Sequence, residues 1–114
     1  HDICDGISKA FKCEVNLNYY DGYPVTNNHK KETEFAVEVA SDISGYKQVD
    51  GNGTPIMGSE DFSYMLLERP GAYLHVGQGY GPPLHSPEYD FNDDLAPIGA
   101  SFFAKLVEKA QPLD

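Results

Sequence analysis

The first part of the chain carries apolar residues at two different spacings. Ile3, Ile7 and Phe11 recur every four residues, which places them on one face of a helix. Residues 13–20 then alternate between apolar and polar positions, which is the period of a half-buried strand. We therefore predict an amphipathic helix over residues 1–12 and a strand over residues 13–20.

Beyond residue 27 the pattern alternates between helices and short strands. Helical periodicity predicts three further helices, the first from Asn28 as cap to Gly45, the second from Ser59 as cap to Pro70, and the third beginning after Asn92 or Asp93. Short runs predict strands at residues 47–50 and 72–76. Alternation of this kind indicates an α/β protein in which helices cover a sheet.

The net charge of the chain limits the classes of partner that it is expected to bind. Eight Lys and Arg against 18 Asp and Glu give the 114 residues a net charge of −10 and a pI near 4.6. Such a balance removes the electrostatic attraction that drives binding to nucleic acids and anionic membranes. Divalent cations remain compatible with this negative field. No apolar run approaches the length of a bilayer span, so we expect neither a nucleic-acid partner nor a membrane partner.

The two cysteines bear on the cellular compartment. Cys4 and Cys13 match neither a CxxC pair nor a zinc ribbon, which favours two buried free thiols in a reducing compartment over a disulfide of a secreted protein. The chain opens His-Asp-Ile-Cys without an initiator Met or a signal region, so we expect a processed or truncated chain and a cytoplasmic location.

The sharpest single chemical feature is His85. It lies between Leu84 and Ser86-Pro87 in a Gly/Pro-rich loop over residues 77–92, directly after the strand predicted at residues 72–76. Loops at strand ends are where α/β proteins place ligands, and a neutral imidazole is a good donor to a divalent metal. On spacing alone, however, an exposed loop histidine explains the residue better than a metal ligand, because no HxxxH, HxH or CxxC pattern supplies further donors.

A second feature is the turn over residues 57–62, Met-Gly-Ser-Glu-Asp-Phe. Gly58 allows close approach to the backbone, and amides at a helix start can receive a carboxylate or another anion. A helix capped by Ser59, with acidic residues in its first turn, explains the same residues without a ligand-binding role. Of the other histidines, His75 is expected to be half-buried and hydrogen-bonded in its strand, and His29 and His1 support no functional role.

Four blocks taken in order resemble the end of a metallo-aminoacylase. They are Gly22-Tyr23-Pro24-Val25-Thr26-Asn27-Asn28, Met57-Gly58-Ser59-Glu60-Asp61-Phe62, Pro70-Gly71, and Leu84-His85-Ser86-Pro87 continuing through Asp90-Phe91-Asn92 to Pro97-Ile98-Gly99-Ala100. The family is that of hippurate hydrolases and indole-acetyl-amino-acid hydrolases, which are related to the zinc carboxypeptidases. Its members are several times longer than this chain.

The resemblance implies a fold and a division of the chain. Residues 1–27 would be the closing helix and strand of a sheet-and-helix lid domain, which in this family often carries the dimer contact. Residues 28–114 would be the C-terminal part of a zinc-peptidase-like α/β catalytic domain. A homo-oligomer is therefore expected.

The resemblance also implies an activity and a set of site residues. The intact protein would be a metal-dependent amidohydrolase that cleaves N-acyl amino acids, with zinc, manganese or a similar divalent metal. His85 matches the last metal-binding histidine of the family, whereas Gly58, Ser59, Glu60 and Asn28 would line the substrate cleft. His29 stands where the family tends to have an acidic residue.

Two expectations concern the chain by itself. The other metal ligands and the glutamate that activates water in this family have no match here, so we identify no catalytic residue in the chain. We therefore expect the isolated chain to bind metal weakly or not at all and to hydrolyse nothing. The alternative interpretation is a non-enzymatic acidic α/β module that binds a partner or a cation through the loop at residues 77–92.

Overall fold

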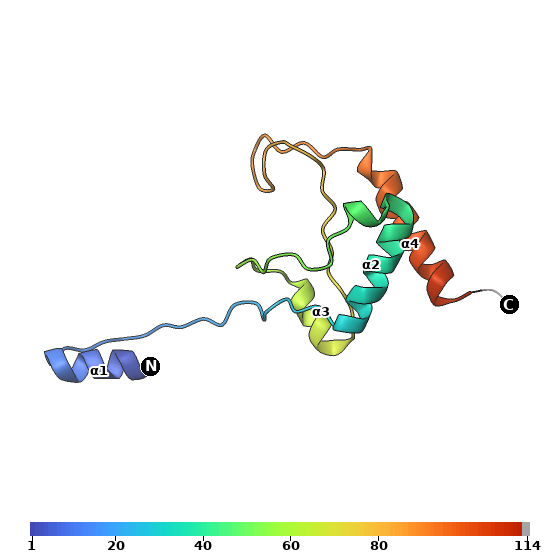
Figure 1. The fold of residues 1–114 in the computed structure, drawn as a ribbon. Helices are drawn as coiled ribbons and strands as arrows, with labels where there is room; N and C mark the ends of the chain where they lie inside the picture. Colours follow the sequence, from blue (N-terminus) through green and yellow to red (C-terminus); the bar gives the residue numbers. More distant parts are fainter. Residues whose placement is uncertain (113–114) are drawn as a thin grey trace.

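Residues 1–112, which the computed structural model describes, form four α-helices and one short 3-10 helix (Figure 1). Their bounds are α1 Asp2–Phe11, α2 Lys30–Ser44, η1 Tyr46–Gln48, α3 Phe62–Glu68 and α4 Leu95–Ala110. All four α-helices lie where the hydrophobic spacing predicts them. No helix in this part of the chain is long and apolar enough to cross a membrane.

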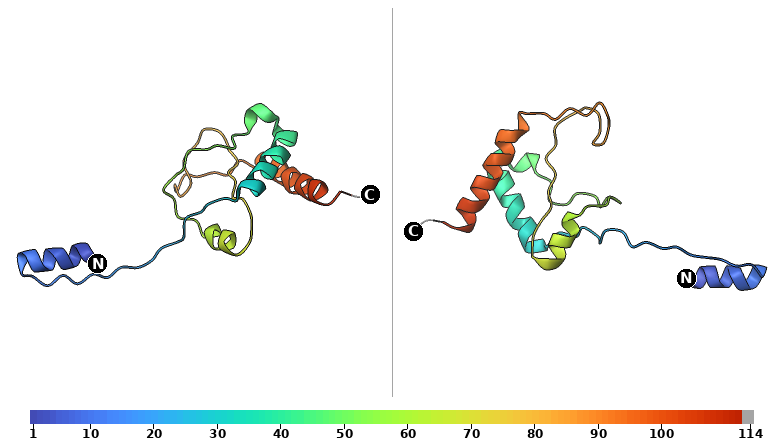
Figure 2. Two further views of the ribbon diagram at one scale, coloured as in Figure 1. Left: turned by 60° about the horizontal axis from the view of Figure 1, so that its bottom comes forward. Right: turned by 180° about the vertical axis from the view of Figure 1, so that it is seen from behind.

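The helix α1 and the segment after it form an outlying unit. Lys12 takes the left-handed conformation at φ 52° and ends the helix, and its neighbour Cys13 exchanges hydrogen bonds with Ser8. The chain then doubles back, and residues 13–19 run alongside α1 (Figures 1 and 2). The apolar face of α1 is not buried as its spacing suggests, because Ile3 and Phe11 are 79% and 76% exposed.

The buried hydrophobic residues of the described chain lie on α2 and α3. The two long helices α2 and α4 lie against each other, and Figure 2 shows this pairing from two further directions. Ala36 and Val39 of α2 and Leu66 of α3 are the buried hydrophobic residues of the described chain. A salt bridge reinforces the contact between α2 and α4, because Lys109 Nζ lies 2.7 Å from a carboxylate oxygen of Glu38 and 2.8 Å from one of Asp42.

Two glycines shape the connection after α2. Gly45 follows the last helical residue with φ 83°, a conformation that glycine adopts without strain, and its N–H donates to the carbonyl of Ser41. Gly51 packs closely on α2, since a Cβ atom at this position would lie 2.9 Å from Cγ2 of Val37. The predicted end of α2 at Gly45 is therefore confirmed, and Gly51 keeps the following loop against this helix.

The predicted strands do not form in residues 1–112, so the sheet of the expected α/β class, including its lid portion, is absent from the described structure. Residues 13–20 and 72–76 pair with no neighbouring strand, and residues 46–48 form η1 instead of the start of a strand. A strand is stabilised by hydrogen bonds to an adjacent strand, which alternation within one segment cannot provide.

The predicted helix caps are also wrong. The residues that precede α2, α3 and α4 are His29, Asp61 and Asp94, and none of their side chains caps its helix. The predicted caps form other bonds or none: Asn28 bonds to a distant segment, and Asn92 accepts from the backbone N–H of Asp94 in a turn before α4. The sequence pattern therefore predicts the first residue of each helix only to within a few positions.

The overall shape is extended. The radius of gyration is 20.9 Å and the molecule measures 71 × 39 × 21 Å, whereas a compact domain of this length has a radius of gyration of about 13 Å. The accessible surface of 10197 Å² likewise exceeds the roughly 6,200 Å² of a folded monomer of this mass. Large apolar side chains therefore remain exposed over much of the chain.

Candidate functional site

The first part of the candidate site is built around the side chain of Asn28. Its Nδ2 donates to the carbonyl oxygen of Tyr73 at 2.8 Å, and its Oδ1 accepts from the backbone N–H of Tyr73 at 2.7 Å. The next residue repeats the pattern with Gly71, since the N–H of His29 donates to the Gly71 carbonyl at 3.0 Å and Nδ1 of His29 accepts from the Gly71 N–H at 3.2 Å. Four hydrogen bonds thus join the start of α2 to the segment that follows α3.

The second part is the turn that precedes α3. An oxygen of the Glu60 carboxylate accepts from the backbone N–H of Phe62 at 3.2 Å, and the hydroxyl of Thr26 donates to the Glu60 carbonyl at 3.5 Å. The ring of Phe62, at the end of this turn, packs against the ring of Tyr73. Asn28 therefore bonds to the backbone of Tyr73, whereas the turn that contains Glu60 meets Tyr73 through the ring of Phe62.

The electrostatics of this contact favour a charged carboxylate and a neutral phenol. The Phe62 N–H, followed by the Tyr73 hydroxyl and Asp61, lowers the pKa of Glu60 below its ordinary value of 4.5. The neighbouring Glu60 carboxylate, followed by partial burial, raises the pKa of Tyr73 above 10.0.

Aromatic packing fixes the ring of Tyr73. Its centroid lies 5.5 Å from that of Phe62 at the start of α3, and the imidazole of His75 meets it edge-on at 5.1 Å. His75 is exposed, so the predicted half-buried state of this histidine is wrong. Tyr73 is therefore held by rings on two sides and by the two bonds of its backbone to Asn28.

Gly58 and Ser59 lie outside this cluster. Both are exposed, and a Cβ atom at Gly58 would meet only a side-chain carbon of Ile56, 3.9 Å away. Ser59 does not cap α3, because the helix begins three residues later at Phe62. Gly58 and Ser59 are therefore accessible to a ligand, but no described contact joins them to Asn28.

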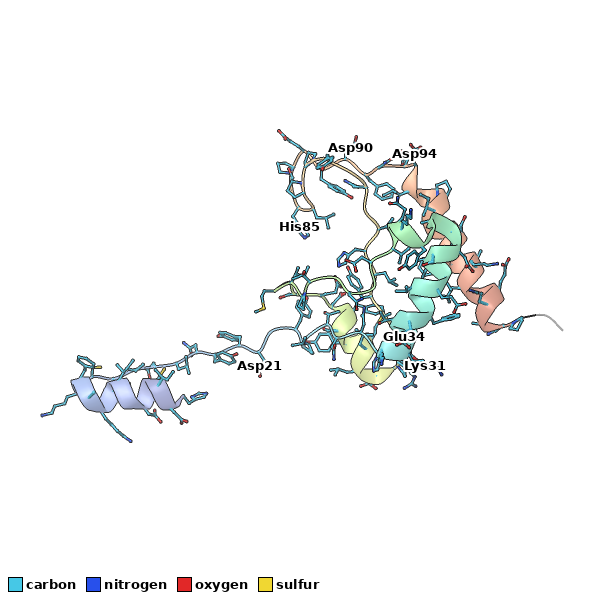
Figure 3. All side chains as sticks on the ribbon, in the orientation of Figure 1. Asp21, Lys31, Glu34, His85, Asp90 and Asp94 are labelled. Atoms are coloured by element: carbon cyan, nitrogen blue, oxygen red, sulfur yellow. The ribbon has the colours of Figure 1, made fainter. Side chains whose placement is uncertain are left out.

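His85 lies at the tip of the long loop over residues 77–92 (Figure 3). It is exposed and has φ 69°, a left-handed conformation that is uncommon for residues other than glycine. The base of the loop is braced by Gln78, whose Oε1 accepts from the Tyr89 hydroxyl at 3.0 Å and whose Nε2 donates to the Asp90 carbonyl at 3.4 Å. The structure thus presents His85 on a folded loop but does not bring it to Asn28 or Glu60.

A hollow of about 500 Å³ opens where this loop approaches α4. Asp90, Asp93 and Asp94 line it together with Tyr80, whereas His85 does not. Within residues 1–112, no three His, Cys, Asp or Glu side chains converge closely enough to hold a metal ion. The residues in hand therefore do not form a complete metal centre, and His85 can supply at most one nitrogen donor to such a centre.

The cysteines are both free thiols in the structure. Cys4 is half-buried and Cys13 is exposed, so the expectation that both thiols are buried is wrong. Their exposure follows from the position of α1 away from the core, which leaves few atoms to cover them.

The sequence relates the chain to a known family. The model of peptidase family M20/M25/M40 matches residues 3–109, which is nearly the whole chain. The chain therefore belongs to the M20/M25/M40 peptidase family.

Several curated relatives have hydrolase names. The hippurate hydrolase of Campylobacter jejuni is 37% identical over 109 residues, which is 96% of this chain and 28% of that protein. The N-acetyldiaminopimelate deacetylase of Lacticaseibacillus casei is 34% identical over 99 residues, which is 85% of this chain and 25% of that protein. The IAA-amino acid hydrolase ILR1-like 2 of Arabidopsis thaliana is 35% identical over 99 residues, 81% of this chain and 22% of that protein.

The chain spans about a quarter of the length of the curated relatives it matches. No solved structure showed significant similarity to it. The predicted resemblance to hippurate hydrolases and indole-acetyl-amino-acid hydrolases is confirmed by these relatives.

Sequence reasoning missed Tyr73, which connects the two parts of the site. Its position in the short apolar run at residues 72–76 indicated only a strand. A tyrosine in such a run is nevertheless a usable signal, because a partly buried phenol requires a hydrogen-bond partner.

Proposed function

We propose that the full-length protein carrying these residues is a metal-dependent amidohydrolase that cleaves the amide bond of N-acyl amino acids. The observation that carries this proposal is the 37% identity to a hippurate hydrolase across 96% of the chain. Relatives named as an N-acetyldiaminopimelate deacetylase and an IAA-amino acid hydrolase support the same substrate class. Because the family match covers residues 3–109, this proposal is favoured over a non-enzymatic acidic module.

His85 is proposed as one ligand of the divalent metal, which would be zinc, manganese or a similar ion. Its exposure at the tip of a braced loop supports this role, since the imidazole is free to meet donors from other parts of the protein. Such a metal supplies Lewis acidity when it is bound. The isolated chain, which offers only His85 to the proposed metal site, is proposed to bind metal weakly and to have no amidase activity.

Asn28, Gly58, Ser59 and Glu60 are proposed to contact the substrate. The support differs between them: Asn28 is fixed on the Tyr73 backbone and Glu60 on the Phe62 N–H, while Gly58 and Ser59 are exposed on the turn that leads to Glu60. Residues 1–27 are proposed to belong to a lid domain and residues 28–114 to a catalytic domain. The separation of α1 from the packed helices α2 and α4 in Figure 1 is consistent with this boundary.

A homo-oligomer is proposed as the functional form. The exposed apolar side chains of α1 and of the segment after it support this, since monomers seldom leave such surfaces uncovered. Sedimentation of the full-length protein as a dimer or larger assembly is expected, and a monomer at all concentrations would contradict it.

The proposed metal role is tested by replacing His85 in the full-length protein. His85→Ala is expected to lower the bound metal per chain and to reduce hydrolysis of N-benzoylglycine by about 100-fold or more. His1→Ala is the matched control, because His1 precedes α1 and lies outside the candidate site. Unchanged metal content and unchanged activity in His85→Ala would overturn the assignment.

A further inference from the structure

The loop that carries His85 is closed at its base by two side chains. The Tyr89 hydroxyl donates to Oε1 of Gln78 at 3.0 Å, and Nε2 of Gln78 donates to the Asp90 carbonyl at 3.4 Å. Both side chains belong to half-buried residues, although most residues of the loop are exposed. The two bonds join positions that lie 11 and 12 residues apart, so they hold the two ends of the loop together.

Two consecutive turns connect this closure to His85. The backbone N–H of Tyr89 donates to the Ser86 carbonyl at 3.0 Å, and the N–H of Ser86 donates to the Pro83 carbonyl at 3.1 Å. His85, labelled in Figure 3, is the third residue of the turn that begins at Pro83. A series of hydrogen bonds therefore runs from Gln78 through Tyr89 to the turn that contains His85.

The backbone of His85 depends on this support. Its φ of 69° is a left-handed conformation, which is unfavourable for residues other than glycine. Such a conformation persists only where surrounding contacts hold it. If the turn opens, the residue is free to return to negative φ, and the imidazole then points in another direction.

The inside of the loop also brings its tip close to its base. Gln78 and Tyr89 line a hollow of about 180 Å³ that Pro83 and Leu84 also line. Leu84 directly precedes His85, so the tip of the loop folds back toward the side chains that close the base. The closure therefore acts on the part of the loop that presents His85.

We propose that Gln78 and Tyr89 are positioning residues for metal binding, because their hydrogen bond holds the turn that presents the His85 imidazole. This inference rests on the proposed function, in which His85 is one ligand of a divalent metal. Gln78 and Tyr89 act through the backbone of the loop and are not ligands themselves. A ligand that is already held in its binding orientation loses less conformational freedom when the metal binds, so the affinity is higher.

Tyr89→Phe in the full-length protein tests this role, since it removes the hydroxyl and keeps the ring. The dissociation constant of Zn²⁺, measured by competition with a chelator, should rise about tenfold. Hydrogen exchange at the Ser86 amide, which closes the turn around His85, should become faster. The melting temperature of the metal-free protein, which a merely structural role would lower, should stay the same.

Gln78→Leu removes the other partner of the same hydrogen bond. It should raise the dissociation constant of Zn²⁺ as Tyr89→Phe does, and the two changes together should have little more effect than either alone. Tyr80→Phe is the matched control, because Tyr80 lies in the same loop and is fully exposed. Loss of the Tyr80 hydroxyl should change neither the dissociation constant nor the exchange of the Ser86 amide.

An unchanged dissociation constant in Tyr89→Phe would overturn the positioning role, as would effects of the two substitutions that add in full. A rise without faster exchange at Ser86, or with a lower melting temperature of the metal-free protein, would also overturn it. If His85→Ala weakens Zn²⁺ binding and Tyr89→Phe does not, the inference fails while the proposed metal role stands. If His85→Ala itself leaves the dissociation constant unchanged, the proposed metal role fails, and the inference fails with it for that separate reason.

Discussion

The side-chain amide of Asn28 replaces a neighbouring strand for Tyr73. It accepts from the N–H and donates to the carbonyl of the same residue, at 2.7 and 2.8 Å, across 45 positions of the sequence. Backbone groups in a partly buried segment require partners, and here one side chain satisfies both. The pairing holds residues 71–73 against the start of α2 in the absence of a sheet.

Asn28→Ala removes both bonds at once and leaves two backbone groups unpaired. We expect the free energy of unfolding, measured with urea, to fall by about 2 kcal/mol. Hydrogen exchange at the Tyr73 amide should become faster. Asn27→Ala is the control, because Asn27 is exposed and belongs to the same segment. Equal stability of the two variants would show that the Asn28 bonds do not support the fold.

Ser63 of α3 is the one buried side chain in the described residues whose hydroxyl lacks a hydrogen-bond partner. An unpaired buried hydroxyl is costly, so Ser63→Ala should stabilise the chain by about 1 kcal/mol. Ser101→Ala, at an exposed position of α4, controls for the better helix propensity of alanine. If Ser63→Ala destabilises the chain in urea unfolding, its hydroxyl has a partner in solution.

Val39 is fully buried at the contact between α2 and the rest of the core. Val39→Ala should lower the free energy of unfolding by about 2 kcal/mol, because it removes apolar contacts and leaves a cavity. The same substitution at Val107, which is 57% exposed on α4, should change stability little. Chemical unfolding followed by circular dichroism distinguishes the two, and equal effects would mean that Val39 is not buried as described.

The salt bridge between α4 and α2 should make their pairing sensitive to pH. The Lys109 hydrogen bond lowers the pKa of Asp42 below its ordinary 3.8, and hydrogen bonds to Asp42 and then Glu38 raise the pKa of Lys109 above 10.5. The Asp42 contribution is present above pH 3.8 and is lost as pH falls through the lowered pKa. The Lys109 contribution is present below pH 10.5 and is lost as pH rises through the raised pKa.

Lys109→Met should therefore lower the melting temperature between these limits and flatten its dependence on pH at both ends. Thermal unfolding at a series of pH values provides the measurement. Since all three side chains are partly exposed, the effect should be small and should weaken with added salt. A variant with the pH dependence of the unmodified chain would show that the ion pair contributes nothing.

The helices could be predicted from the sequence because their signal is local. The four-residue spacing of Ile3, Ile7 and Phe11 and the glycine at position 45 are enough to place α1 and the end of α2. The strands could not be established in the same way, because strand formation depends on a partner segment. The alternation at residues 13–20 is compatible with a strand, but no second strand pairs with it within residues 1–112.

The candidate site was predictable as a set of residues and not as an arrangement. The family resemblance selected Asn28 and Glu60, but no described hydrogen bond joins them to each other or to a common residue. The local pattern predicted Ser59 as a helix cap, and α3 begins beyond it at Phe62. Tyr73 was missed because its hydrogen bonds reach distant positions. Contacts of this kind follow from the packing of α2 against the segment after α3, which no local pattern encodes.

Hydrolysis of N-benzoylglycine by the full-length protein tests the proposed activity most directly. We expect equal amounts of benzoate and glycine to be released, with activity lost after chelation and restored by zinc or manganese. No release of glycine with either metal supplied, and no hydrolysis of N-acetyl or indole-acetyl amino acids under the same conditions, would contradict the assignment as an amidohydrolase of N-acyl amino acids.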